Sequence, residues 1–155
     1  MTIMLGAKIG EESAVPLHTL GTRYHSDDGK EYVYLLADEA ITGLGSVVLI
    51  DGDYGSLMAD ATSANGLIGK GAAVSTGAVT NAYYYWAQTF GVAEVLVAAS
   101  AAAGSLLHVT ATGGVLDDAA ANECFNGIHA TEADGGSGGL ITCVLSYPTI
   151  RLSTS

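Results

Sequence analysis

Basic side chains are scarce in this sequence. It holds five lysine and arginine residues against 16 aspartate and glutamate residues, which gives a formal net charge of −11 over 155 residues. The basic residues are Lys8, Arg23, Lys30, Lys70 and Arg151, and they form no cluster along the chain. Because phosphate binding needs clustered lysine and arginine side chains, we expect no nucleic-acid partner.

Charge of either sign is also low. Charged residues make up 14% of the chain, whereas an average domain carries about 25%. So little charge is typical of a surface that is covered by further copies, by a larger assembly or by a membrane. A membrane-spanning helix needs about 18 apolar residues in a row, and the best candidate, residues 92–107, is interrupted by Glu94 and Gly104. We therefore expect no membrane partner.

Cysteine and proline are rare. Cys124 and Cys143 are too few for a disulfide framework, and we expect both to be reduced and buried. The chain has two prolines and 21 glycines, but its many aliphatic residues argue against disorder. Its length suits one domain with its own core.

Hairpin signals occur twice. Residues 22–25 and 30–36 flank an Asp-Gly turn, which predicts a hairpin with Tyr32 and Tyr34 on the same face of its second strand. Residues 81–88 and 92–97 are rich in aromatic and β-branched residues and are separated by three residues that include a glycine. This pattern predicts a second hairpin.

The rest of the chain repeats short apolar runs between glycine-rich turns. Further strands are predicted at 45–50, 67–68, 72–75, 105–110, 115–116, 125–130 and 140–146, with a helix or loop over 58–65 and a tail from Pro148. Such spacing favours an all-β fold, either a small β-sandwich or a barrel with hairpins and glycine-rich turns. Residues 1–20 have no sustained period, so we expect an extended N-terminal arm followed by a single β domain over residues 21–155.

Three motifs could carry chemistry, but each lacks a required neighbour. Residues 135–139 match the G-x-S-x-G pattern around Ser137, but no histidine follows the serine. Residues 51–55 resemble the start of a calcium loop without its later ligands. The possible zinc ligands, His108, Cys124, His129 and Cys143, lack paired spacing. We therefore expect no catalytic residues, no metal and no cofactor, and a chain that is not an enzyme.

The most distinctive cluster is Tyr83-Tyr-Tyr-Trp86. On a strand, Tyr83 and Tyr85 face one way while Tyr84 and Trp86 face the other. One face should pack on the core, and the other could contact a second subunit, where tyrosine and tryptophan are favoured anchors. The alternative is burial of both faces within one domain. The residues expected at an interface are Ile3, Met4, Leu5, Lys8, Tyr83, Tyr85 and Trp86.

The order of the motifs from about residue 20 to residue 150 resembles the head decoration (capsid cement) proteins of tailed bacteriophages. The blocks that carry the resemblance are residues 84–91 (YYWAQTFG), 95–100 (VLVAAS) and 106–118 (LLHVTATGGVLDD), followed by Gly127-Ile128 and Leu145–Pro148. Residues 20–22 and 29–34 resemble the opening hairpin of that family. The resemblance brings no catalytic residues with it.

This resemblance implies an adhesive protein on the capsid exterior of a virion, which is assembled in the cytoplasm of a host bacterium. The implied partners are the major capsid protein and further copies of the chain, as a homotrimer. The N-terminal arm and a sheet edge are the expected contact sites. The alternative is a carbohydrate- or ligand-binding β module of a phage fibre or lectin-like type, in which the tyrosines and Trp86 would stack on sugars.

Overall fold

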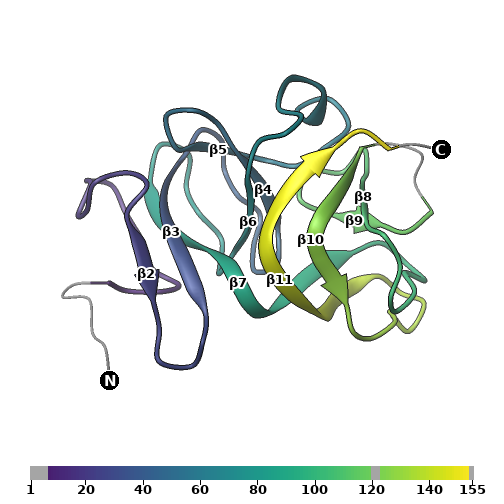
Figure 1. Ribbon diagram of the computed structural model, residues 1–155. Coiled ribbons are helices and arrows are strands. Elements are labelled where there is room, and N and C mark those ends of the chain that lie inside the picture. Colours follow the sequence, from purple (N-terminus) through teal and green to yellow (C-terminus); the bar gives the residue numbers. More distant parts are fainter. Residues whose placement is uncertain (1–6, 120–122, 154–155) are drawn as a thin grey trace.

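The computed structural model describes residues 7–119 and 123–153, and in these residues the chain is almost entirely β-structure (Figure 1). In chain order the strands are β1 (Glu12–Ser13), β2 (Arg23–His25), β3 (Glu31–Ala37), β4 (Val47–Ile50), β5 (Gly55–Met58), β6 (Ala72–Ser75), β7 (Tyr84–Val97), β8 (His108–Val109), β9 (Leu116–Asp117), β10 (Cys124–Ala130) and β11 (Gly139–Arg151). Ala64–Gly66 form a short 3₁₀ helix. The predicted all-β class is confirmed. None of the described residues forms a helix long and apolar enough to span a membrane.

Strand β7 closes two rings of strands. It pairs with β9, β9 with β8, β8 with β10, β10 with β11, and β11 returns to β7. A second ring runs from β7 through β6, β4, β5 and β3 back to β7. The architecture is therefore two barrel-like rings that share one strand. In Figure 1, β7 crosses the molecule from the side of β3 to the side of β11.

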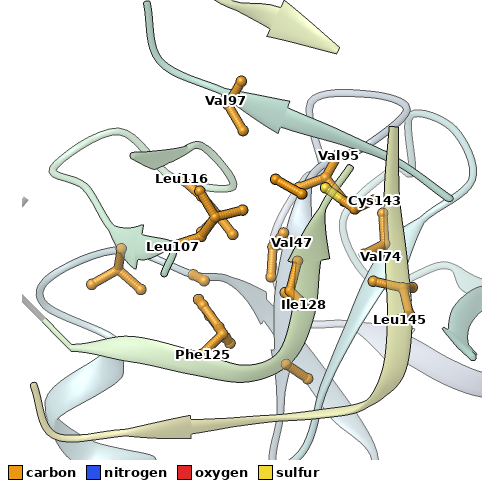
Figure 2. Close-up of a cluster of buried hydrophobic side chains, with 14 of the residues drawn as sticks. Val47, Val74, Val95, Val97, Leu107, Leu116, Phe125, Ile128, Cys143 and Leu145 are labelled. Atoms are coloured by element: carbon orange, nitrogen blue, oxygen red, sulfur yellow. The ribbon is translucent and has the colours of Figure 1, made fainter. Parts of the chain in front are cut away.

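Each ring has its own hydrophobic core, and β4 and β6 form a wall between the two. Val47 and Val74 point into the core inside the β7–β11 ring, where they meet residues such as Leu116 and Phe125 (Figure 2). Val48, the next residue along β4, belongs to the other core. Because both faces of these strands are buried, they have continuous apolar sequences instead of an alternating pattern.

The first predicted hairpin is confirmed by the structure, and the second is wrong. Strands β2 and β3 pair antiparallel around the turn at residues 26–30. Residues 84–97, in contrast, form one continuous strand, β7. Gly91 lies within it with a φ of +94°, so the glycine bends the strand and does not reverse it. The first half of β7 pairs with β3 and the second half with β11.

The structure also differs from two other local predictions and confirms a third. Strand β11 continues through Pro148 to Arg151, so the predicted tail is wrong. Pro148 lies in a bulge of β11 opposite Gly127, where the ladder with β10 is interrupted and a missing N–H does least harm. Residues 67–68 form a loop instead of a strand. Both cysteines are free and buried, as expected.

Candidate functional site

An aromatic layer covers the outer face of β3 and of the first half of β7. Tyr34 and Trp86 lie side by side with ring centroids 4.9 Å apart, and Tyr84 stacks on Tyr34 at 6.1 Å. Tyr24, from β2, stacks on Tyr32 at the same distance. The register explains the layer, because Tyr34 is directly opposite Trp86 and Leu36 is opposite Tyr84 in the β3–β7 ladder.

The segment from residue 7 to residue 20 lies over this layer. Leu17 donates its backbone N–H to the Tyr34 hydroxyl at 3.1 Å. The ring of His18 lies 5.1 Å from Tyr34 and 5.2 Å from Trp86. Glu12 belongs to β1, which pairs with β7, and its carboxylate accepts hydrogen bonds from Thr80. The expected arm is thus docked on the sheet over its described length, and Trp86 is only 2% exposed.

The expected interface residues fall into different environments. Tyr85 points into the core of the β3–β7 ring, where it is 2% exposed, its hydroxyl lies 2.8 Å from Ser56, and burial raises its pKa. Tyr83 packs half-buried against that core. Lys8 is exposed and pairs with Glu11 at 3.5 Å.

Within this chain Tyr85 and Trp86 are therefore buried on opposite faces, which matches the alternative of two-sided burial. Ile3, Met4 and Leu5 lie outside the described residues. The part that Lys8 and Tyr83 play in an interface stays a prediction.

A second apolar surface lies further along β7 and has no cover among the described residues. Val92 on β7 is directly opposite Val144 on β11, and the two side chains are 52% and 40% exposed. Phe90 contacts Tyr147 with ring centroids 5.2 Å apart. The exposed apolar residues of this surface, which we call the bare face, are Phe90, Val92, Leu106, Leu140, Val144 and Tyr147.

Hollows flank the centre of the bare face on both sides. One lies between Val144, Leu106 and His129, and the other lies beside Val92 and Glu94. Charged groups lie around it, and one of them, Glu31, accepts a hydrogen bond from the Tyr147 hydroxyl. Glu94 is exposed two residues beyond Val92, and Lys30 pairs with Asp28 at 3.8 Å. The bare face is therefore an apolar patch with a polar edge, a form typical of protein–protein contact sites.

Sequence reasoning missed the bare face because it placed a hairpin turn at residues 89–91. Alternation along the strand could not have found it either, because the register with β3 shifts between Gln88 and Phe90. Tyr34 is opposite Trp86, whereas Phe90 is opposite Glu31, on the other face of β3.

Many of the acidic side chains brace loops. Asp134 accepts hydrogen bonds from the backbone N–H groups of Ser100, Gly136 and Gly138, and these bonds hold its pKa below the usual value. Asp51 accepts hydrogen bonds from the backbone N–H groups of Asp53 and Gly55 in its own turn. Other acidic side chains that accept backbone bonds are Glu12, Asp28, Glu39, Asp60, Asp117, Asp118 and Glu132.

The motifs considered for chemistry lie in such loops. Ser137 is exposed in the loop that Asp134 holds, and residues 51–55 form a turn around the Asp51 carboxylate. Within the described ranges, no three His, Cys, Asp or Glu side chains gather closely enough to hold a metal ion. The four candidate zinc ligands are accordingly not brought together.

Comparison with known proteins gives a structural likeness and no match in sequence. No family model matches the chain, and no curated protein matches it. Among solved structures, the fold is similar to that of the head fiber gp8.5 N base of bacteriophage phi29, with a TM-score of 0.49 and 16% sequence identity over 74% of this chain and 92% of that chain. A likeness at this identity and TM-score carries no inference about function.

Proposed function

We propose that this protein is a structural virion protein of a tailed bacteriophage, which binds the outer surface of the capsid and bridges neighbouring major capsid subunits. It would act as a homo-oligomer, expected to be a trimer, after assembly in the cytoplasm of the host bacterium. Binding that occurs only to the assembled lattice stabilises the lattice by mass action. Many identical contacts on one shell would add to this effect by avidity.

The observation that carries this proposal is the bare face. An apolar patch that includes Val92, Val144 and Phe90 is left exposed on a chain with little charge, and such a patch favours a protein whose working state is an assembly. The loop-bracing carboxylates fit the same role, because they rigidify the scaffold around the contact surfaces.

The motifs behind the family resemblance also suit a structural role. Tyr84 and Trp86 belong to the aromatic layer under residues 7–20. Gln88 donates its side-chain amide to the carbonyls of Phe90 and Val92 at 3.0 and 2.8 Å, and Gly91 lies at the bend of β7. These residues stabilise and shape the fold. The resemblance therefore supports a family of structural proteins and not a family of enzymes.

The test is to mix the purified protein with expanded, undecorated heads of its own phage and to sediment them. We expect stoichiometric co-sedimentation and a higher temperature of head disruption. Protein that stays in the supernatant at every ratio would contradict the proposal.

The predicted contact through the arm can be tested with point substitutions. Val15 and Leu17 are 60% and 58% exposed on the outside of the segment that covers Trp86. We expect the double substitution Val15→Ser and Leu17→Ser to weaken head binding without unfolding the protein. Leu152→Ser is the matched control, because Leu152 is equally exposed at the other end of the chain. Equal binding by both variants would remove the arm from the capsid contact.

A second candidate function follows from a cavity of about 240 Å³ between residues 7–20 and the aromatic layer. Glu11, Ser13 and Tyr84 line it together with Leu17. A polar cavity beside an aromatic ring can hold a sugar. Specific binding on a glycan array that is lost with Tyr84→Ala would favour a carbohydrate-binding module.

A further inference from the structure

Residues 7–20, which we call the strap, cover the aromatic layer while they stay exposed themselves. No residue of this described segment is buried, whereas Trp86 and Tyr34 beneath it are each 2% exposed. The strap therefore shields apolar surface of the sheet and buries little apolar surface of its own. A segment of this kind can open locally at a lower free energy than the unfolding of the whole chain.

Few contacts attach the strap to the sheet. Strand β1 pairs with β7 at Glu12 and Ser13, whereas β3 and β11 together pair with β7 along its length. The Glu12 carboxylate accepts hydrogen bonds from Thr80, and the Leu17 N–H is donated to the Tyr34 hydroxyl. A cavity of about 240 Å³ lies between the strap and the aromatic layer. Packing is therefore incomplete there, and fewer dispersion contacts are lost when the strap opens.

The strap ends at a point where the chain is held to the sheet. Gly21 has a φ of +84° and donates its N–H to the Tyr34 carbonyl at 2.9 Å, and a Cβ atom on Gly21 would lie 2.5 Å from the Tyr54 ring. This close contact fixes Gly21 against the sheet. Neither of the two rings of strands contains β1, so the strap can leave without breaking a ladder of either ring.

We propose that the strap opens and closes as a unit while both rings of strands stay folded, and that it thereby controls the exposure of the aromatic layer. In the closed form Trp86 and Tyr34 are shielded from solvent. In the open form these rings and the backbone of β7 at Tyr84 and Tyr85, which β1 pairs with, become accessible. This device goes beyond the capsid role, and its test uses free protein without heads, so the two can fail separately.

The position of the tryptophan makes opening measurable, because Trp86 is the single tryptophan of the chain and lies under the strap. Hydrogen exchange of the full-length wild type gives a second readout. The amides of Leu17 and Thr80, which take part in the strap contacts, should exchange at least about tenfold faster than the amides of the β3–β7 ladder.

A disulfide between the strap and the sheet should lock the closed form. Ser13 is directly opposite Tyr84, and opposite residues of antiparallel strands have a Cα separation that a disulfide can span. In the double variant Ser13→Cys and Tyr84→Cys, oxidation should lower the quenching of Trp86 by acrylamide and slow exchange at Thr80. Reduction should reverse both changes. Because the oxidised and reduced forms have the same sequence, their difference reports the lock and not the substitutions.

A matched pair of variants tests the opposite change. Glu12→Ala removes the hydrogen bonds to Thr80 and should raise the quenching of Trp86 severalfold. The denaturant midpoint of the strands, followed by far-UV circular dichroism, should stay at the wild-type value. Glu11→Ala is the control, because Glu11 is the neighbouring exposed carboxylate but pairs with Lys8 inside the strap, and it should leave the quenching unchanged.

Two results would overturn the inference. Strap amides of the wild type that exchange as slowly as those of the β3–β7 ladder would mean that the strap opens only when the whole chain unfolds. Equal quenching of Trp86 in the oxidised and reduced double variant would mean that another movement exposes the ring. If the disulfide does not form, the exchange rates of the wild type and Glu12→Ala decide the question.

Discussion

The two halves of β7 differ in how far their apolar side chains are covered by the rest of the chain. In the first half, Tyr84 and Trp86 are covered by residues 7–20, and Trp86 is 2% exposed. In the second half, beyond the register shift between Gln88 and Phe90, the side chains of Phe90 and Val92 are 36% and 52% exposed. The difference therefore comes both from this irregularity in the strand and from what the rest of the chain places over it.

This contrast separates two uses of apolar residues. The covered half contributes to the folding of one chain, because its side chains are removed from water in the monomer. The bare half contributes little to that folding, because its side chains stay in contact with water in the single chain. Substitutions in the first half should therefore lower the free energy of unfolding, whereas those in the second should change association.

The largest expected effect is at Trp86. Trp86→Ala should lower the free energy of unfolding by about 3–5 kcal/mol, because it opens a cavity between Tyr34 and His18 in the covered half. Denaturant unfolding of the full chain measures this loss. A loss below about 1 kcal/mol would mean that residues 7–20 do not pack on the sheet in solution.

A smaller effect is expected at the junction of the two halves. Gly91 has a φ of +94°, and a Cβ atom there would lie 3.1 Å from Lys30 Cγ and 3.2 Å from the Gly29 carbonyl oxygen. Gly91→Ala should therefore cost about 1–3 kcal/mol of unfolding free energy. Gly52→Ala is the control, since its Cβ would meet nothing within 4 Å. Similar unfolding curves for the two variants would show that the bend at Gly91 is not required.

The same junction marks the limit of prediction from sequence. Alternation correctly placed Tyr32 and Tyr34 on one face of β3, because a hairpin with an Asp-Gly turn depends on neighbouring residues alone. The bend at Gly91 was mistaken for a turn, because a glycine between two apolar runs has the same local pattern in both cases. What decides between them is the pairing of β7 with β11, whose residues lie far along the chain.

The site was less predictable than the fold for the same reason. The alternation of Tyr83 to Trp86 was predicted correctly, but which side would be covered depends on residues 7–20, which carry no periodic signal. Val92 and Val144 face the same way only because β7 and β11 pair in a particular register. Short-range patterns contain no information about that register.

A third effect depends on pH and concerns the loop beside the bare half. Hydrogen bonds from the backbone N–H groups of Ser100, Gly138 and Gly136 lower the pKa of Asp134 below the ordinary 3.8. A carboxyl whose folded-state pKa is depressed stabilises the fold above its unfolded pKa, and this stability is lost as pH falls through the folded value. The melting temperature of the wild type should therefore be higher than that of Asp134→Ala at pH 7. The two melting temperatures should become equal as the pH falls below the folded-state pKa of Asp134. A constant difference at all pH values would mean that the Asp134 charge is not responsible.

The smallest effect on stability is expected at the centre of the bare half. Val92→Thr should change the free energy of unfolding of the single chain by no more than about 0.5 kcal/mol, because the Val92 side chain is 52% exposed and its β-branched shape is kept. The same substitution should weaken the assembly contact of the proposed function, since it would bury a hydroxyl group there. Unfolding in dilute protein and co-sedimentation with heads separate the two quantities. A large loss of stability in dilute protein would mean that Val92 is already covered within one chain, and the contrast between the two halves of β7 would then disappear.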